Sequence, residues 1–424
     1  MSAVDVEVQV GVAVRTIRVG LLGFGVVGQA VARAATTESD RLAQSGVLLK
    51  CIGALVRDVE RPRAAPEIRV TDTPAAFPWR ECDVIVEALG GVEPACTLVT
   101  QALTAGIPVV TANKSLIAAH GPALRRLAAV RRVPLYFEAA VIAGVPCVHT
   151  LARRPLASGD AVFTGVLNGT SHYLLSRVAR GDRFEDALQR AVELGYAEPA
   201  SDNDVSGRDA AEKLTILLHL AGHESVAPTD LPRRGIDAVE PWHLATARTL
   251  GGVIKPVAHA AAAPRHAWVG PAFVPNSHPC AAIDGVTNAL IANGVTSIGP
   301  GAGPDVTAAT VIDDVVEAVV GRATALPLPQ SSPAGHGAWN IAPGKWFLAL
   351  DNVHASSGEL AEFLAARHLP AVAFAGDDTR GRRAVVTANA PARVLLDAVD
   401  ALSALGVTVT WYPVLPTSAE VARG

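Results

Sequence analysis

The sequence predicts an α/β protein that begins with a doubly wound parallel sheet and ends with a small ferredoxin-like α+β domain. Three observations predict this. Strand and helix patterns alternate from residue 16 to residue 111. A glycine-rich turn, Gly23 to Gly28, joins the first strand to the first helix. Residues 345–424 follow the order strand, helix, strand, strand, helix, strand.

Composition bounds the class of protein. A chain of 424 residues that is 50% hydrophobic can bury more than one core, so we expect two or three domains. The net charge of −4 and the absence of a basic stripe argue against nucleic acid as a partner. The apolar runs are too short to cross a membrane, no signal peptide pattern opens the chain, and five scattered cysteines indicate buried thiols. We therefore expect a cytoplasmic protein.

The first strand, turn and helix have the pattern of a Rossmann-type dinucleotide site. Thr16–Leu22 is an apolar, β-branched run, and helix-forming residues continue after the turn to Ala35. In such a turn the first glycine permits a tight bend, the second lets the backbone approach a pyrophosphate, and the third packs helix on strand. This predicts cofactor binding at Gly23, Phe24, Gly25, Val26, Val27 and Gly28.

The second predicted strand, Val47–Val56, ends where a residue that reads the ribose is expected. Arg57, with Arg61 and Arg63 behind it, could meet a 2′-phosphate and favour NADP. Asp58 could instead bond a 2′-hydroxyl and favour NAD. The arginines could also belong to an ordinary solvated loop, and these alternatives stay open.

Further residues follow the next two strands, Asp83–Glu87 and Pro108–Thr111, which a helix over Glu93–Ala105 separates. Ligands of doubly wound sheets lie outside the carboxyl ends of the strands, so both strand ends should face the cofactor. The residues expected there are Gly90, Thr111, Asn113 and Lys114, together with Gly303 before a long helix over Asp305–Gly321. From pattern alone, an ordinary surface charge is the favoured interpretation of Lys114.

A glutamate interrupts the apolar segment Leu135–Val148, which we read as a strand that runs into a turn. A buried lone Glu138 costs several kcal/mol unless it is paired or coordinated. A cation held by Glu138 and nearby carbonyls would account for it, and so would a hydrogen-bonded core glutamate.

The stretch Gly195–His219 combines an acidic loop with an amphipathic helix that begins at Ser206. Asp209 and Lys213 are four residues apart and share a helical face, so they can bind a zwitterion and move a proton. Two simpler interpretations remain. Ser206 and Asp209 match a capping box, and the Asp–Lys pair could be a solvated surface pair.

The domain boundaries follow from these patterns. We expect a dinucleotide-binding domain over 1–147, completed by the helix 305–321, and a substrate and dimerisation domain over 148–304. Residues 325–344 are rich in Pro, Gly and Ser and predict a linker before the domain over 345–424. That last domain contains no constellation for chemistry, so binding, regulation or assembly is expected of it.

Taken together, the motifs resemble homoserine dehydrogenase over nearly the whole chain. The matching strings are GLLGFGVVG (20–28), VEALGG (86–91), TANKSLIA (111–118), FEAAVIAGVPCV (137–148), LNGTSHYLL (167–175), GYAEP (195–199), DVSGRDAAEKLTIL (204–217) and GPGAG (299–303). The resemblance implies NAD(P)H-dependent interconversion of L-aspartate 4-semialdehyde and L-homoserine, a small-molecule substrate, and a homodimer or higher homo-oligomer. It also implies that the last domain is an ACT module, the unit that senses amino acids.

The resemblance also assigns roles by position. Glu198 and Asp209 would hold the substrate ammonium group, and Lys213 would protonate or hold the reacting oxygen. Lys114 would share the proton transfer at the nicotinamide side. Further substrate contacts are implied at Gly169, Thr170, Tyr196 and Asp204, and a Na⁺ or K⁺ site at Glu138 with the carbonyls of Val141, Ala143 and Val145.

Departures from the family pattern keep two alternatives open. Ala200-Ser201 stands where Asp-Pro is usual, which is compatible with a dehydrogenase of a related amino-acid semialdehyde. Residues 351–358 replace the short turn that helps an ACT module bind its effector, so feedback control by threonine is in doubt. A catalytically silent nucleotide-binding sensor is the alternative from a different class. It would not need Lys114, Glu198, Asp209 and Lys213 together.

Overall fold

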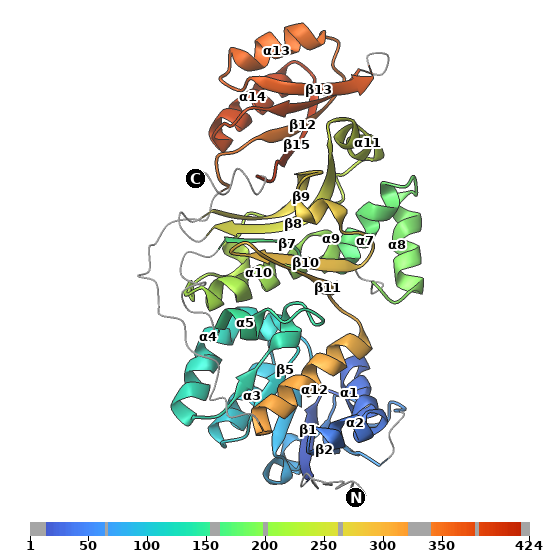
Figure 1. Cartoon of the computed structure of the whole chain (residues 1–424), viewed down its shortest axis with the longest axis vertical. Helices are drawn as coiled ribbons and strands as arrows, with labels where there is room; N and C mark the ends of the chain where they lie inside the picture. Colours follow the sequence, from blue (N-terminus) through green and yellow to red (C-terminus); the bar gives the residue numbers. More distant parts are fainter. Residues whose placement is uncertain are drawn as a thin grey trace, which may run out of the picture. The chain divides into compact units, whose positions relative to one another are not determined.

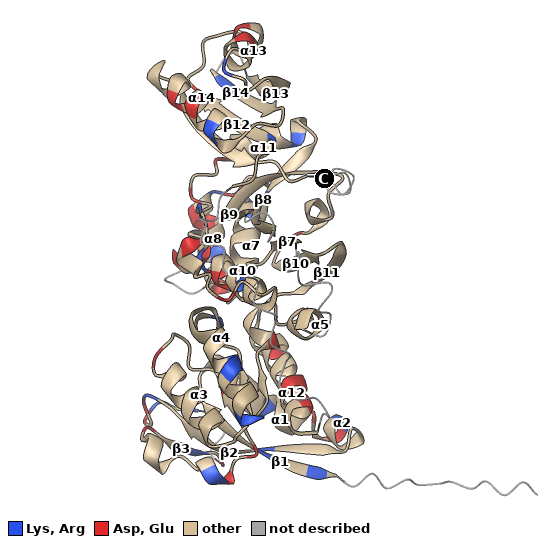
Figure 2. Ribbon diagram, turned by 90° about the vertical axis from the view of Figure 1, so that its left-hand side faces the viewer, with Lys and Arg blue, Asp and Glu red and all other residues tan. Residues whose placement is uncertain are grey.

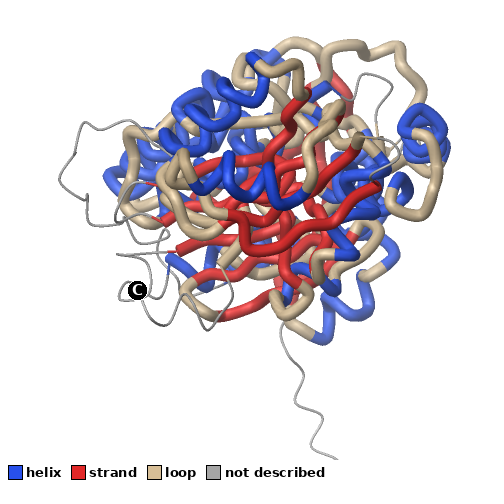
Figure 3. The backbone as a smooth tube through the Cα atoms, turned by 90° about the horizontal axis from the view of Figure 1, so that it is seen from above, coloured by secondary structure: helices blue, strands red, loops and turns tan. Residues whose placement is uncertain are grey.

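A computed structural model describes residues 14–63, 67–152, 162–197, 202–261, 266–320, 341–377 and 381–416. It divides into two compact units, one that contains strands β1–β6 with helix α12 and one that contains β7–β15. Figure 3 colours the helices of both units blue and their strands red. No described helix has the length and apolarity needed to cross a membrane.

The first unit is a parallel sheet of six strands in the order β3-β2-β1-β4-β5-β6. Its strands are β1 (Arg15–Leu22), β2 (Val47–Leu55), β3 (Arg69–Thr71), β4 (Val84–Glu87), β5 (Val109–Thr111) and β6 (Leu135–Tyr136). The order reverses between β1 and β4, so the chain winds in both directions from β1. The carboxyl ends of these two strands therefore form the crevice where such sheets bind ligands.

Helices cover both faces of this sheet because consecutive crossovers run in opposite directions from β1. They are α1 (Val26–Thr37), α2 (Ser39–Gln44), α3 (Ala95–Thr104), α4 (Lys114–Arg131) and α12 (Pro304–Val320). Helix α12 packs on α1, and α3 packs on α4 (Figure 1). The long helix near residue 305 thus belongs to the first unit, although 167 residues lie between the end of β6 at Tyr136 and the start of α12 at Pro304.

The second unit contains a five-stranded antiparallel sheet in the order β11-β10-β7-β8-β9. Its strands are β7 (Val162–Val166), β8 (Gly252–Ala261), β9 (His266–Pro275), β10 (Thr287–Ala292) and β11 (Val295–Pro300). Its helices are α5 (Val148–Ala152), α7 (Gly169–Val178), α8 (Phe184–Glu193), α9 (Asp202–Val205), α10 (Arg208–Leu220) and α11 (Pro241–Thr249).

The C-terminal part of the second unit is an antiparallel sheet in the order β13-β14-β12-β15, which is the ferredoxin-like order predicted from the sequence. Its elements are β12 (Trp346–Asp351), α13 (Ser357–Ala365), β13 (Ala371–Asp377), β14 (Arg382–Thr387), α14 (Ala392–Ala404) and β15 (Thr408–Pro413). One face carries the apolar residues that pack with α13 and α14. The other joins a core with α7, α8, α11 and β9, where the rings of Phe273 and Phe347 stack 5.4 Å apart.

Some elements differ from the sequence predictions, and one predicted segment lies mostly outside the described residues. The strand expected over Leu135–Val148 is only Leu135–Tyr136, because the backbone then turns through a short 3₁₀ helix, Glu138–Ala140. The hairpin β10–β11 was not predicted, although its turn, Asn293-Gly294, with φ of 49° and 79°, is a strong hairpin signal. Of the linker expected over 325–344, only residues 341–344 are among those described.

The described elements show where the charged residues and the cysteines lie. Basic and acidic residues are both scattered over the described elements (Figure 2). None of the five cysteines forms a disulfide; Cys82, Cys147 and Cys280 are buried, whereas Cys51 and Cys96 are half-buried. Burial raises the pKa of Cys51, Cys82 and Cys280 to about 12, which keeps these thiols protonated and unreactive.

Candidate active site

The glycine turn has the geometry that a pyrophosphate requires. Gly23 has a φ of 98°, and a Cβ there would lie 2.5 Å from the carbonyl oxygen of Ala88. A Cβ on Gly28 would lie 2.3 Å from the carbonyl oxygen of Gly23, whereas a Cβ on Gly25 would have nothing within 4 Å. The first and third glycines therefore serve close packing, and the second keeps the helix N-terminus open to a phosphate. Of the other predicted turn residues, Phe24 is buried, Val27 is half-buried and Val26 is exposed.

The ends of β4 and β5 are tied together by Glu87, which the sequence predictions did not single out. Its carboxylate is fully buried and accepts hydrogen bonds from the Thr111 hydroxyl at 2.5 Å, the Leu89 amide at 2.8 Å and the Asn113 side chain at 3.2 Å. Burial raises the pKa of Glu87, and these donors partly offset that effect. The signal that pointed to Glu138, a glutamate within an apolar strand, is also present here.

These bonds order the start of α4. Asn113 caps the helix by accepting from the Leu116 amide at 3.1 Å, and its amide donates to the Gly91 carbonyl at 2.7 Å. Lys114 is the first residue of the helix. Gly90 and Gly91 have φ of 77° and 73°, with open space where side chains would be. The predicted strand-end residues are thus brought together in one loop system.

The loop after β2 contains the residues predicted to read the ribose. Arg57 and Asp58 are both exposed. Asp58 accepts from the Glu60 amide at 2.9 Å, and its carbonyl accepts from Arg63 at 2.6 Å. Arg63 is therefore occupied within its own loop, and Arg57 is placed directly at the end of the strand. Gly303, before α12, has a φ of 122°.

In the second unit, Lys213 and Asp209 form a buried ion pair. Lys213 Nζ lies 3.0 Å from Asp209 Oδ2 and donates to the Leu167 carbonyl at 2.8 Å. The two side chains are 9% and 8% exposed. A buried pair of this kind keeps a fixed geometry, unlike a solvated pair on a helix surface. The interpretation of Asp209 and Lys213 as a solvated pair is therefore wrong.

The capping-box interpretation of Asp209 is also wrong. Helix α10 begins at Arg208 after Gly207, whose φ of 76° interrupts the helix predicted from Ser206. No side chain caps α10, and Ser206 follows the separate short helix α9. The carboxylate of Asp209 instead points to Lys213 and Asn168.

Asn168 connects the acidic residues of this cluster, a role that was not predicted. Its side-chain amide donates to Asp204 at 2.6 Å and to Asp209 at 2.8 Å, and its side-chain oxygen caps α7 by accepting from the Ser171 amide at 2.7 Å. One asparagine thus fixes the position of two carboxylates around Lys213.

The remaining predicted substrate residues lie on neighbouring segments. Gly169 begins α7, where a Cβ would meet the Val286 carbonyl at 2.8 Å. The Thr170 hydroxyl donates to the Tyr196 carbonyl at 2.5 Å, which joins α7 to the loop that follows α8. Glu198, with Ala200 and Ser201, lies outside the described residues.

Glu138 is buried in the first unit, as its apolar context predicted. Its backbone amide donates to Asp314 Oδ2 at 3.1 Å, and the Ala143 carbonyl accepts from the Thr310 hydroxyl. Val141 and Ala143 are buried in the first unit and Val145 in the second. Within the described ranges, no group of three or more His, Cys, Asp or Glu residues could hold a metal ion.

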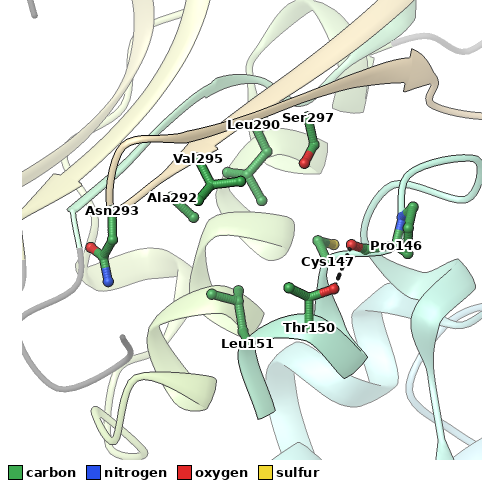
Figure 4. Close-up of a pocket in the computed structure, with 9 residues that line it drawn as sticks. All are labelled: Pro146, Cys147, Thr150, Leu151, Leu290, Ala292, Asn293, Val295 and Ser297. Carbon is green, nitrogen blue, oxygen red and sulfur yellow. Dashed lines mark hydrogen bonds between the residues drawn. The ribbon is translucent and has the colours of Figure 1, made fainter. Parts of the chain in front are cut away.

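A small pocket with a volume of about 80 Å³ lies between α5 and the β10–β11 hairpin (Figure 4). It is not suited to proton transfer. The residues that line it are uncharged, and the Thr150 hydroxyl points to the Pro146 carbonyl at 3.1 Å. The pocket therefore offers no acid or base.

Comparisons with known proteins match both units. The family model described as Homoserine dehydrogenase, NAD binding domain, matches residues 23–138, and the model described as Homoserine dehydrogenase matches residues 146–316. The homoserine dehydrogenase of Corynebacterium glutamicum is 38% identical over 318 residues, which are 71% of each chain. That of Mycobacterium leprae is 35% identical over 424 residues, covering 93% of this chain and 96% of the relative.

Solved structures agree. The crystal structure of a homoserine dehydrogenase from Thiobacillus denitrificans matches with a TM-score of 0.85 at 28% identity, covering 96% of this chain and 100% of that one. A Staphylococcus aureus homoserine dehydrogenase matches with a TM-score of 0.73 at 26% identity, covering 95% and 99%. The fold predicted from sequence is confirmed, and the chain belongs to the homoserine dehydrogenase family of NAD(P)-dependent oxidoreductases that act on a CH–OH group.

Proposed function

We propose that Lys213 transfers the proton in the homoserine dehydrogenase reaction of this chain, the interconversion of L-aspartate 4-semialdehyde and L-homoserine. The observation that carries this proposal is the buried contact of Lys213 with Asp209 at 3.0 Å and with the Leu167 carbonyl at 2.8 Å. Reduction of an aldehyde builds negative charge on its oxygen. A preorganised cationic donor stabilises that charge.

The hydrogen-bond geometry of Lys213 supports a donor role. An ammonium group has three protons, and among the described residues Leu167 and Asp209 take two of them. The third proton remains for the substrate oxygen. Asp209 holds the ammonium in one orientation and stabilises its charge, so the donor needs little rearrangement during the reaction.

The carboxylates around Lys213 suit the substrate's ammonium group. Asp209 and Asp204 both face the Asn168 amide, which fixes their separation. We infer that Asp209 and Glu198 bind the ammonium group directly. Asp204, Tyr196, Gly169 and Thr170 complete the substrate loop.

The residues of the first unit fit a nicotinamide dinucleotide. The open position at Gly25 leaves room for a pyrophosphate at the N-terminus of α1, and a Cβ at Gly28 would disturb the turn that provides it. When bound, the cofactor supplies the hydride. Lys114, held at the start of α4 by the Asn113 cap, is proposed to act as the second lysine on the nicotinamide side. Arg57 favours NADP, since its side chain is exposed at the end of β2 whereas Arg63 is occupied.

We also propose a Na⁺ or K⁺ site at Glu138, with the carbonyls of Val141, Ala143 and Val145. What supports it is the resemblance of these positions to the family's cation site, together with the burial of Glu138, which is 4% exposed. Replacing both ions by choline should then lower activity, and restoring either one should recover it.

We propose that the chain forms a homodimer through an edge strand of the five-stranded antiparallel sheet. Strand β11 is an edge strand, and its Val295 and Ile298 are 50% and 56% exposed. An apolar edge of this kind invites pairing with a second copy. Light scattering after gel filtration tests this, and a monomer at micromolar concentration contradicts it.

We also propose that the ferredoxin-like domain is an ACT module. The assay below tests whether threonine changes the rate of the enzyme.

The experiment that tests the proposed function is a steady-state assay of the purified chain with L-aspartate 4-semialdehyde. NADPH and NADH are compared, with and without threonine. We expect turnover with this substrate and a lower KM for NADPH, which Arg57→Ala should raise selectively. Turnover only with a longer or shorter semialdehyde would identify a related dehydrogenase and reject the proposed substrate.

A further inference from the structure

A cavity of about 300 Å³ lies in the second unit among α7, α11, the start of β8 and the segment that ends at Asp284. This volume is at the lower end of the range for small-molecule sites. The cavity contains none of the residues assigned above to substrate or cofactor. Its charged lining residues are Arg180, Arg248, Lys255 and Asp284.

The basic residues form a floor and a rim. Lys255 is 8% exposed and forms the floor, while Arg180 and Arg248 are exposed at the rim. Arg180 pairs with Asp284, and Arg248 donates to the Ala179 carbonyl. The cavity therefore has one carboxylate, already paired, and two further positive charges.

Within the described chain Lys255 donates hydrogen bonds to neutral partners, and the nearby carboxylate of Asp284 is paired with Arg180. Its ammonium donates to the Ile283 carbonyl at 2.5 Å and to His172 Nε2 at 3.0 Å. His172 Nδ1 lies 3.1 Å from the Thr287 carbonyl. Because a carbonyl can only accept, Nδ1 carries the proton and Nε2 is the acceptor from Lys255. The histidine is therefore neutral and cannot balance the charge of Lys255.

A buried ammonium without a paired anion is costly. Burial lowers the pKa of Lys255, and Asp284 partly opposes that effect. An anion in the cavity would add a negative charge beside Lys255 and would also meet the guanidinium of Arg248 at the rim.

We propose that this cavity binds a small oxyanion, either inorganic phosphate or a carboxylate, between the Lys255 ammonium and the guanidinium of Arg248. Guanidinium and ammonium groups donate strong, charge-assisted hydrogen bonds to both kinds of oxyanion. A single-oxyanion ligand fits the cavity size and needs no aromatic contact.

The cavity is also connected to the proposed active site. Lys255 bonds His172, and the His172 amide donates to the Asn168 carbonyl at 3.3 Å within the first turn of α7. Asn168 holds Asp204 and Asp209. Hydrogen bonds therefore link the cavity to the start of α7, where Asn168 positions Asp204 and Asp209.

The test is a titration of the full chain with sodium phosphate and, separately, with sodium acetate. Thermal unfolding is the readout, and chloride holds the ionic strength constant. We expect a saturable rise in the melting temperature with at least one anion, and the tighter of the two identifies the source. Arg248→Ala should weaken the apparent affinity by about tenfold or more, as expected for loss of a charge-assisted hydrogen bond.

Two controls separate this site from others. Arg190→Ala removes an exposed arginine that pairs with Glu193 on α8, and it should leave the affinity unchanged. Arg57→Ala tests whether the phosphate binds beside the glycine turn instead. Lys255→Met should abolish binding of the anion. If Lys255→Met does not fold, Arg248→Ala alone still tests the proposal. No saturable effect in the wild type, wild-type affinity in Arg248→Ala, or loss of the effect in Arg57→Ala overturns the proposal.

Discussion

The substitution Asn168→Asp separates the two roles of Asn168. The new side chain has nearly the same shape, and its oxygen can still cap α7 by accepting from the Ser171 amide. The donor that lies 2.6 Å from Asp204 and 2.8 Å from Asp209 becomes an acceptor. Three carboxylates then share one small volume beside Lys213.

The cost follows from electrostatics. Two charges about 3 Å apart repel by roughly 5 kcal/mol at an effective dielectric constant of about 20. Protonation of the new carboxyl removes this repulsion and so limits the loss in the free energy of unfolding. Raising its pKa from about 3.9 to 7 costs about 4 kcal/mol. Because Asp204 is half-buried and Lys213 offsets Asp209, we expect a loss of about 2–3 kcal/mol in the free energy of unfolding at pH 7.5.

The sign of the pH dependence is fixed by the raised pKa of the new carboxyl. The folded variant binds more protons than the unfolded chain above pH 4, so its deficit relative to the wild type should shrink as the pH falls from 7.5 to 5. Urea unfolding at both pH values measures this. The steady-state assay should show a raised KM for the semialdehyde.

Ser356→Ala is the matched control, because Ser356 caps α13 by accepting from the Glu359 amide and contacts no site residue. It should cost about 1 kcal/mol without changing the kinetics. If Asn168→Asp is as stable as the wild type at pH 7.5, or its deficit is the same at pH 5, the bridging role of Asn168 is refuted.

Three further predictions concern the rest of the fold. Glu87→Gln replaces the carboxylate that accepts from Thr111 and should cost about 1–3 kcal/mol while raising the KM of the cofactor; an unchanged KM would contradict its role in ordering the strand ends. Gly28→Ala places a Cβ 2.3 Å from the Gly23 carbonyl, so the dissociation constant of the cofactor, measured by fluorescence titration, should rise sharply, and unaltered affinity would argue against the turn geometry. Burial lowers the pKa of His243 to about 4, so the unfolded chain binds more protons between pH 6.5 and 4 and stability falls as the pH drops through that window. His243→Gln should flatten this fall by up to about 1.4 kcal/mol per pH unit in urea unfolding, and an unaltered slope would count against it.

Features set by short-range chemistry were predictable from the sequence. The glycine turn depends on φ and on close contacts within a few residues, so Gly23, Gly25 and Gly28 indicated its geometry directly. The C-terminal domain was predictable because alternation and helical periodicity are strong in each of its elements. The Asn293-Gly294 turn of the β10–β11 hairpin is an equally local signal, because both residues have positive φ.

Long-range partners could not be read from the sequence. Asn168 meets Asp204 and Asp209 only after 36 and 41 residues have folded back. The same holds for the fully buried carboxylate of Glu87, whose contact with Thr111 spans 24 residues. Spacing placed Asp209 and Lys213 on one helical face, but their burial, which separates a catalytic pair from a surface pair, depends on tertiary packing.

The central claim is that Lys213 donates the proton to the reacting oxygen. The most direct measurement compares kcat of Lys213→Met with the wild type in the L-aspartate 4-semialdehyde assay, alongside the dissociation constant of the cofactor. Lys50→Met, at an exposed lysine on β2, is the control. We predict that kcat falls by about 10²–10⁴-fold in Lys213→Met while cofactor affinity is unchanged. A Lys213→Met enzyme with a kcat close to that of the wild type would contradict the claim.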